Sequence, residues 1–239
     1  DELATMKIVI ISDTHGGHED LGQLCGDVLI HCGDVEHLFR KDDRAIEKID
    51  NWFGRQKFSH ILCIGGNHDL TLEEQARDGT QPFQNATFLH DAELVLDGVK
   101  FFGASWVPNL NNHAFFADEP ALNEAWSKIP DDVDVLITHT PPAGVLDVSS
   151  RGLALGCKHL AKRLKTLKPV LHCFGHVHAS AGSRKRGGTT YVNASSVNSS
   201  FEITVAPFEF DLLAKNLRTR EGILAKLFSW RPFRNGAQR

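Results

Sequence analysis

Side chains able to bind metal ions follow five separate apolar runs in this 239-residue chain. Each run is short and ends in a polar loop, and the loops together hold Asp13, His15, Asp34, Asn67, His68, Asp69, His139, His176 and His178. In open α/β sheets, ligands collect in the crevice outside the carboxyl ends of the strands. Five such loops would therefore bring Asp, Asn and His to one place. One isolated D-x-H or H-x-H would be weak evidence, whereas five such segments in order predict a single site.

This set of donors favours a transition metal. Carboxylate, amide carbonyl and neutral imidazole suit Mn, Fe or Zn, and none of the five loops contains a cysteine that would favour a thiolate site. A carboxylate can bridge two cations about 3.5 to 4 Å apart, which lowers the pKa of a shared water and clamps both oxygens of an in-line displacement. Gly33, Gly66 and Gly175 would let backbone and ligand come close to the ions. We expect a centre of two metal ions.

The apolar runs that position these loops are typical of buried central strands. They cover residues 7–11, 28–32, 61–64, 133–138 and 170–174, and helical patterns lie between them at residues 42–53, 120–128 and 158–167. The Asp97-Gly98 pair predicts a hairpin of residues 94–96 and 99–102, and residues 189–192 and 201–205 are expected to add late strands. This alternation of strands and helices predicts a layered α/β sandwich with mixed sheets.

In chain order the loops read D-x-H at 13–15, G-D at 33–34, G-N-H-D at 66–69, a single His139, and G-H-x-H at 175–178. This series resembles the pattern of the calcineurin-like metallophosphoesterase superfamily, and the match covers residues 6–211. The resemblance implies a four-layer α/β sandwich of two mixed β-sheets flanked by helices. It implies that one ion is held by Asp13, His15, Asp34 and His178, and the other by Asp34, Asn67, His139 and His176. Asp34 would be the bridge.

The same resemblance assigns roles to the residues beside Asn67. His68 would stabilise the transition state and protonate the leaving oxygen without binding a metal, and Asp69 would orient it. Residues 27–34, 103–108, 138–142 and 190–195 are most similar to the small metallophosphoesterase-domain-containing subfamily and to the class III cyclic-nucleotide phosphodiesterases. Some animal members of that subfamily have Gly at the first His of G-H-x-H and are weak catalysts. His176 occupies that position here, which implies full activity.

We therefore expect a binuclear metal-dependent phosphoesterase that hydrolyses phosphodiesters such as cyclic nucleotides, by in-line attack of a hydroxide shared between the ions. A diester is expected because none of the five ligand segments contains Arg or Lys, which enzymes usually add to bind a monoester dianion. Two alternatives stay open. One is a phosphomonoesterase acting on a small-molecule or protein phosphate, and the other is a catalytically idle scaffold with this fold.

Three further residues are candidates for contact with the substrate. Trp106 and Asn109 follow an apolar run, where they could stack on or cap a base, and His113 lies in a loop that could line the mouth of the site. An aromatic residue at a sheet edge is at least as often part of the core. Binding to nucleic acid is not expected, because the body of the chain is acidic and lacks interleaved cations and aromatics.

The charge of the chain is unevenly distributed. From Leu212 onward there are seven Lys or Arg residues against one Glu, which gives +6 and leaves −10 for the rest. Residues 212–239 are expected to form a basic amphipathic extension that binds a membrane surface, a partner or a second copy, or packs on its own domain. The five cysteines are odd in number and form no C-x-x-C pair, so we expect reduced thiols and a cytoplasmic protein.

Overall fold

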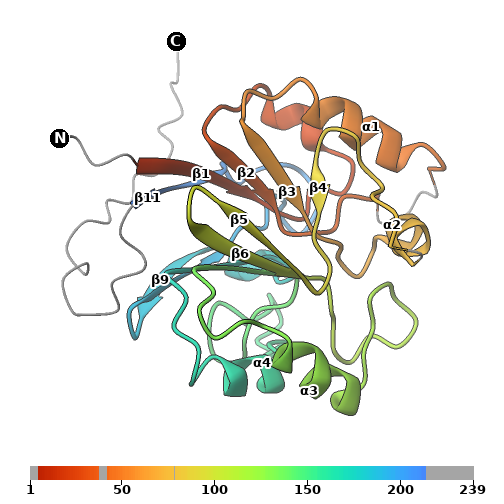
Figure 1. Ribbon diagram of the computed structural model, residues 1–239. Helices are drawn as coiled ribbons and strands as arrows, with labels where there is room; N and C mark the ends of the chain where they lie inside the picture. Colours follow the sequence, from red (N-terminus) through yellow and green to blue (C-terminus); the bar gives the residue numbers. More distant parts are fainter. Residues whose placement is uncertain (1–4, 38–41, 78, 214–239) are drawn as a thin grey trace, which may run out of the picture.

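The computed structural model describes residues 5–37, 42–77 and 79–213, which form two β-sheets with helices on their outer faces (Figure 1). The first sheet has the strand order β11-β1-β2-β3-β4. Its strands are β1 (Thr5–Ile11), β2 (Val28–His31), β3 (His60–Cys63), β4 (Thr87–Phe88) and β11 (Phe208–Leu213). The second sheet has the order β5-β6-β7-β8-β10-β9. Its strands are β5 (Ala92–Leu96), β6 (Val99–Ala104), β7 (Val135–Thr138), β8 (Leu171–Phe174), β9 (Gly182–Arg186) and β10 (Thr189–Asn193).

Both sheets are mixed, with parallel strands inside and antiparallel strands at the edges. β1 to β4 pair in parallel, and β11 joins β1 in the antiparallel direction. β6, β7, β8 and β10 are parallel, while β5 and β9 are antiparallel to their neighbours. Because the central strands of a sheet run the same way, the loops that follow them leave at the same edge. This topology places the predicted ligand loops of each sheet together.

The side chains of the strands alternate between two kinds of core, as the period of a strand requires. Ile8 and Ile10 of β1 pack between the sheets, whereas Val9 and Ile11 pack on the outer face. The outer face of the first sheet is covered by α1 (Ala45–Phe53) and α2 (Leu70–Ala76), and that of the second by α3 (Glu119–Ser127) and α4 (Lys158–Arg163) (Figure 1). The four-layer α/β sandwich expected from the sequence is confirmed.

Several predicted elements are confirmed and others differ. The hairpin at Asp97-Gly98 forms between β5 and β6, with both turn residues at positive φ, 48° and 83°. The predicted helix 158–167 ends at Arg163, and the predicted strand 201–205 is wrong. That segment is a tight turn held by Asn198, whose side-chain oxygen accepts hydrogen bonds from the backbone N–H groups of Ser200 (2.8 Å) and Glu202 (3.1 Å).

Strands at the edges of the sheets were missed for a physical reason. β9 has the sequence GSRKR and is largely exposed, so it lacks the apolar signal of a buried strand. β11 completes the first sheet and runs to Leu213, two residues beyond the predicted end of the domain at Asp211. The rest of the predicted basic extension lies outside the described residues. In the described ranges no helix is both long and apolar enough to cross a membrane.

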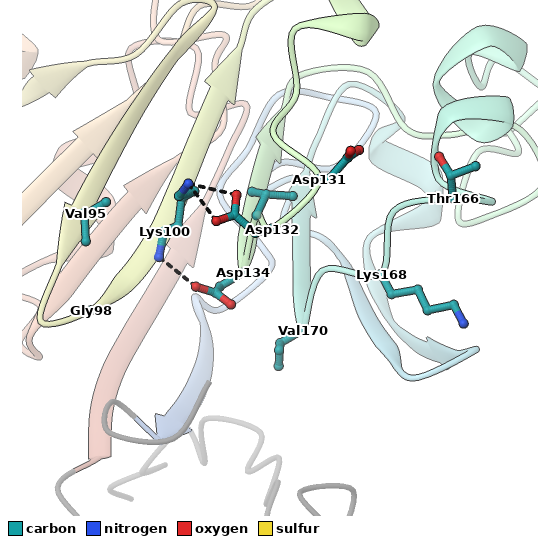
Figure 2. Close-up of a pocket in the computed structure, with 10 residues that line it drawn as sticks. Val95, Gly98, Lys100, Asp131, Asp132, Asp134, Thr166, Lys168 and Val170 are labelled. Atoms are coloured by element: carbon teal, nitrogen blue, oxygen red, sulfur yellow. Dashed lines mark hydrogen bonds and ion pairs between the residues drawn. The ribbon is translucent and has the colours of Figure 1, made fainter. Parts of the chain in front are cut away.

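A groove of about 950 Å³ lies at the amino ends of β6, β7 and β8 (Figure 2). On its floor the ammonium group of Lys100 contacts Asp132 at 2.8 Å, and the backbone N–H of Lys100 donates to Asp134 at 2.8 Å. Lys168 lies across the groove in Figure 2. The predicted ligands follow the carboxyl ends of β7 and β8, so this groove is at the other end of the strands from them.

Candidate metal centre

Backbone hydrogen bonds join the ligand loops to one another. The N–H of Asp13 donates to Gly33 O at 2.9 Å, which ties the loop after β1 to the loop after β2. The N–H of Gly175 donates to His139 O at 3.0 Å and ties together two loops of the second sheet. The two sheets are connected by the N–H of His176, which donates to the carboxylate of Asp13 at 3.0 Å. The loops therefore form one structural unit.

A first group of donors gathers around Asp13. Asp13, His15 and His178 each offer one ligand atom, and these atoms all lie within 4.8 Å of one another. The Nε2 atom of His178 is 3.4 Å from Asp13 Oδ1 and 3.4 Å from His15 Nε2. The Nε2 atom of His15 is 3.8 Å from Asp34 Oδ2. These four residues are those that the resemblance assigns to one ion.

A second group lies on the other side of Asp34. Asp13, Asp34 and His139 also offer ligand atoms within 4.8 Å of one another. His139 Nε2 is 3.4 Å from Asp34 Oδ2 and 3.0 Å from Asn67 Oδ1, and that amide oxygen is 2.7 Å from His176 Nδ1. Asp13 belongs to both groups, and Asp34 Oδ2 lies within 3.8 Å of His15 Nε2 in the first and 3.4 Å of His139 Nε2 in the second. The structure thus brings all seven predicted ligands together, with Asp34 between His15 and His139.

Four of these ligands have left-handed backbone conformations. Asp13, His15, Asp34 and His176 have φ values of 52°, 45°, 57° and 69°. This region is uncommon for residues other than glycine and is energetically costly, and it recurs at functional sites where the surroundings hold the backbone in place. The chain accepts this cost at four donors of one cluster, which indicates that their placement serves a function.

Two glycines let the loops approach the carboxylates. A Cβ atom on Gly175 would lie 2.1 Å from Asp13 Oδ2, and one on Gly66 would lie 2.3 Å from Asp34 Oδ1. Real Cβ atoms do not make contacts this short, so any side chain at either position would displace a carboxylate. The predicted close approach at Gly66 and Gly175 is confirmed.

The charges of the cluster are arranged for a cation. Burial alone would raise the pKa of the carboxyl groups of Asp13 and Asp34. The nearby histidines have the opposite and larger effect, His178 and His139 on Asp13 and His139 and His15 on Asp34. Both pKa values therefore lie below the usual range. Burial acts to lower the pKa of His139, yet Asp34 raises it to about 9. Asp13 likewise raises the pKa of His178, whereas burial lowers the pKa of His15 and lowers that of His176 to about 4. The protons of His139 and His178 thus lie where positive charge is favoured. Since a metal ion displaces such protons when it binds, this donor set fits divalent cations.

The histidine tautomers also suit metal binding. The Nδ1–H of His139 donates to Cys32 O at 2.8 Å, and the Nδ1–H of His15 donates to Glu36 O at 3.3 Å. Each hydrogen bond uses the Nδ1 atom, so Nε2, which faces the carboxylates, would be the nitrogen that binds a metal ion once the ion has displaced any proton there. Such bonds to backbone carbonyls fix the ring orientation of metal-ligating histidines.

His68 lies beside the two groups rather than inside them. Its backbone N–H donates to Asp34 Oδ1 at 2.8 Å, and its half-buried ring contacts the rings of His15 and His113 at centroid distances of 5.4 and 5.5 Å. Burial lowers the pKa of His68 to about 4. A phosphate anion beside the ring would favour the protonated form.

The predicted role of Asp69 is corrected by its contacts. Its carboxylate accepts hydrogen bonds from the backbone N–H groups of Asp34 (2.8 Å), Glu36 (2.8 Å) and Gly66 (2.7 Å). The side chain is fully buried, and all of its hydrogen bonds within the described residues go to backbone, none to the ring of His68. Asp69 therefore positions the loops that carry Asp34 and Asn67 and does not orient His68.

The three candidate substrate residues lie in different surroundings. His113 contacts His68, so the structure brings it to the edge of the cluster. Trp106 packs on the ring of His90 at 4.6 Å, and its indole N–H donates to Asp91 at 2.7 Å, which makes it part of the structural framework. Asn109 is exposed with a φ of 63°, and no described contact joins it to the seven ligands.

Two residues of the site were missed from the sequence. The hydroxyl of Ser195 donates to Asp13 Oδ2 at 2.7 Å, and its position two residues after the end of β10 could have indicated it. The ring of Phe201 lies edge-on to His15 and His178 at 5.2 and 5.6 Å. No sequence signal pointed to Phe201, because its segment was assigned to a strand.

Similar proteins agree with this geometry. The "UPF0046 protein K07C11.7" of Caenorhabditis elegans is 34% identical over 227 residues, which cover 89% of this chain and 77% of the relative. The human "Metallophosphoesterase domain-containing protein 1" is 32% identical over 232 residues, covering 86% and 71%. Among solved structures, the phosphopantetheinyl hydrolase of Mycobacterium tuberculosis has a similar fold, with a TM-score of 0.54 and 14% identity over 82% of this chain and 90% of that one.

The sequence model of the family described as calcineurin-like phosphoesterase matches residues 6–180. That span includes all five loops and the seven predicted donors within them. The chain therefore belongs to the calcineurin-like phosphoesterase family of metal-dependent phosphoric ester hydrolases.

Proposed function

We propose that this protein is a phosphodiesterase that acts with two divalent ions, of Mn, Fe or Zn. The first ion would be held by Asp13, His15, Asp34 and His178, and the second by Asp34, Asn67, His139 and His176. When bound, the ions would supply the positive charge that acidifies a water and withdraws charge from the phosphoryl group. In the reaction a P–O bond to the leaving alcohol breaks, a new P–O bond forms from water, and one proton moves to the leaving oxygen.

The composition of the donor set is the observation that carries the preference for diesters. Asp13 and Asp34 are the carboxylates among the seven ligands, and the other five are neutral donors. Two dications with two carboxylates and one attacking hydroxide leave a net charge of about +1. A phosphodiester monoanion neutralises this charge, whereas a monoester dianion would leave an excess of negative charge.

His68 is the residue that we assign to the proton transfer. Its ring lies beside His15 but outside both ligand groups, so it can face a bound phosphate without occupying a metal site. The hydrogen bond from its backbone N–H to Asp34 fixes its distance from the bridging carboxylate. An imidazolium in this position would stabilise the charge of the transition state and protonate the leaving oxygen.

We infer the compartment from the cysteines rather than from the site. All five cysteines are unpaired, and four of them are buried. This is the usual state of thiols in a reducing compartment, which supports a cytoplasmic location.

Two substrates with the same leaving group test the proposal. Bis-p-nitrophenyl phosphate and p-nitrophenyl phosphate should be compared by kcat/KM with Mn²⁺-loaded protein, because the shared leaving group isolates the effect of charge. The diester is expected to be preferred. A tenfold or greater preference for the monoester would identify a phosphomonoesterase instead. Turnover of neither substrate by Mn-, Fe- or Zn-loaded protein would show that the chain is an idle scaffold.

A further inference from the structure

A cavity of about 540 Å³ opens directly beside two of the metal ligands, His176 and His178. It lies between three loops, which contribute Ser149, Leu155, Val197, Asn198, Thr204 and Val205 to its walls. This volume is within the range of cavities that bind small organic ligands. The cavity therefore has room for a substituent of a phosphate that is bound at the metal centre.

The walls of this cavity are uncharged. Leu155, Val197 and Val205 supply apolar surface, and Ser149 and Thr204 supply hydroxyl groups. Within the described part of the chain, no Lys, Arg, Asp or Glu lines it. Such walls favour a neutral organic group over a second phosphate or a carboxylate, because a buried charge without a partner is costly.

A row of rings fixes the orientation of a substrate relative to the cavity. The rings of His113, His68, His15 and His178 contact one another in that order, with centroid distances of 5.5, 5.4 and 5.3 Å. His113 is at one end of this row with the proposed proton donor His68 next to it, and the cavity begins at His178, at the other end. A phosphate at the centre would therefore direct its leaving oxygen toward His68 and its remaining substituent toward the cavity.

The loop that closes one side of the cavity is held in a strained conformation. Phe201 has a φ of 61°, which is unusual for an aromatic residue, and its ring contacts both His15 and His178. Val197 and Asn198 precede Phe201 and line the cavity, and Val197 forms a bridge with Ile203. Strain of this kind marks segments whose geometry serves a site.

We propose that this cavity binds the ester group that stays on phosphorus, and that this group is a neutral, ring-containing substituent such as an aryl group or a nucleoside. The proposal rests on the proposed phosphodiesterase activity for the orientation of the substrate. Leu155 is 38% exposed at the rim of the cavity, where its side chain would contact such a ring. Apolar contact with the ring would favour it over a methyl group by roughly tenfold in affinity.

Binding without hydrolysis tests the cavity directly. Dimethylphosphinate and methyl(phenyl)phosphinate are monoanions without an ester bond, and their affinities for Mn²⁺-loaded protein can be measured by calorimetry. The phenyl compound is expected to bind about tenfold more tightly. Leu155→Asp should abolish this advantage. Leu153→Asp is the matched control, because Leu153 is 59% exposed on the same loop but does not line the cavity, and it should keep the advantage.

Turnover separates this inference from the proposed function. Phenyl p-nitrophenyl phosphate and methyl p-nitrophenyl phosphate share a leaving group, and the wild type should prefer the phenyl ester by kcat/KM while Leu155→Asp should not. Equal binding of the two phosphinates, or equal effects of Leu155→Asp and Leu153→Asp, would overturn the cavity assignment. Selective phosphinate binding without turnover of either ester would overturn the proposed function and support the cavity as a binding site.

Discussion

The two sheets contribute different chemistry to the same centre. Loops of the first sheet supply both carboxylates, Asp13 and Asp34, together with Asn67 and His15. Loops of the second sheet supply imidazoles alone, from His139, His176 and His178. The charge of the site is therefore fixed within one sheet, and the other sheet adds neutral donors to it. A complete centre requires both sheets to be packed together.

The ligand loops are also held in different ways. In the first sheet, the buried carboxylate of Asp69 accepts three backbone N–H groups and joins the loops after β2 and β3. On the side of the second sheet, His176 and Ser195 donate hydrogen bonds to Asp13. The second-sheet loops thus take their position from a carboxylate of the first sheet. Substitutions in the two sheets should accordingly have different consequences.

The largest effect is expected on turnover, from a first-sheet residue that binds no metal. His68→Ala should retain two ions per chain and lower kcat by roughly 10² to 10⁴-fold, because it removes only the proton donor. The loss should be smaller for p-nitrophenyl esters than for phenyl esters, since p-nitrophenolate needs little protonation. Steady-state kinetics with both esters, together with metal analysis, check this. Loss of metal, or an unchanged rate, would show that His68 has another role.

Asp69→Asn should affect metal binding and folding together. The amide oxygen of Asn can still accept a hydrogen bond, but its NH₂ group would face backbone N–H groups that also need an acceptor. We therefore expect the free energy of unfolding to fall by about 1 to 3 kcal/mol. We also expect Mn²⁺ to bind about 10 to 100-fold more weakly. Asp147→Asn is the matched control in the loop between β7 and α4, where a buried carboxylate accepts from the N–H of Gly144 at 2.9 Å. The control should keep its metal affinity. Equal loss of Mn²⁺ affinity in both variants would contradict the role of Asp69 in holding the first-sheet loops.

Sequence patterns were sufficient for the donors because each donor directly follows a buried strand. The same patterns could not show that Asp69 binds three backbone N–H groups, since those groups become neighbours only when the loops after β2 and β3 fold together. The family resemblance suggested His68 as its partner, whereas in the structure the carboxylate accepts from the backbone N–H groups of Asp34, Glu36 and Gly66. The structure places Asn67 Oδ1 beside His139 and His176, where the motif predicted it, because the motif fixes both residue type and order.

The ends and edges of the sheets were harder to predict than their centres. Residues 201–205 have the composition of a strand, yet two hydrogen bonds to Asn198 Oδ1 hold a turn there. A side chain that satisfies backbone donors competes with strand pairing, and composition does not reveal it. Phe201 reaches the metal centre only because of that turn. The cavity beside it could not be predicted for the same reason.

A smaller effect is expected from a buried histidine of the second sheet. The hydroxyl of Thr138 donates to Thr140 O, so it accepts from the Nε2–H of His172 at 2.9 Å. The Nδ1 atom of His172 is buried and has no hydrogen-bond partner among the described residues. Burial lowers the pKa of His172 to about 3. In the unfolded chain the histidine has a pKa of about 6.5, so as the pH falls the unfolded state takes up a proton before the folded state does. The stability that neutral His172 contributes is therefore fully present above pH 6.5 and is lost as the pH falls toward 3.

His172→Phe should remove this dependence. Between pH 7.5 and 5.5 the wild type should lose about 1.4 kcal/mol more unfolding free energy than the variant, as measured by denaturant titration. The exposed His60 provides a control, and His60→Gln should follow the wild type. Parallel pH profiles for wild type and His172→Phe would show that His172 is not held neutral.

The smallest effect is expected from the basic extension. Removal of residues 215–239 leaves every described strand of the two sheets in the chain, since the last of these, β11, spans Phe208–Leu213. Turnover of a small diester per folded molecule should stay within about twofold of the wild type. Self-association or binding to anionic vesicles should change instead. A truncated protein that binds two ions but has lost turnover would show that the extension shapes the site.

Metal content with and without the bridge tests the central claim most directly. Wild type and Asp34→Asn should be reconstituted with Mn²⁺, freed of excess metal and analysed for ions per chain, with Asp147→Asn as the buried carboxylate control. The account predicts two ions in the wild type and the control. It predicts close to none in Asp34→Asn, because a neutral residue supports two dications poorly. Trace metal in the wild type, or two ions retained by Asp34→Asn, would contradict a binuclear centre built on Asp34.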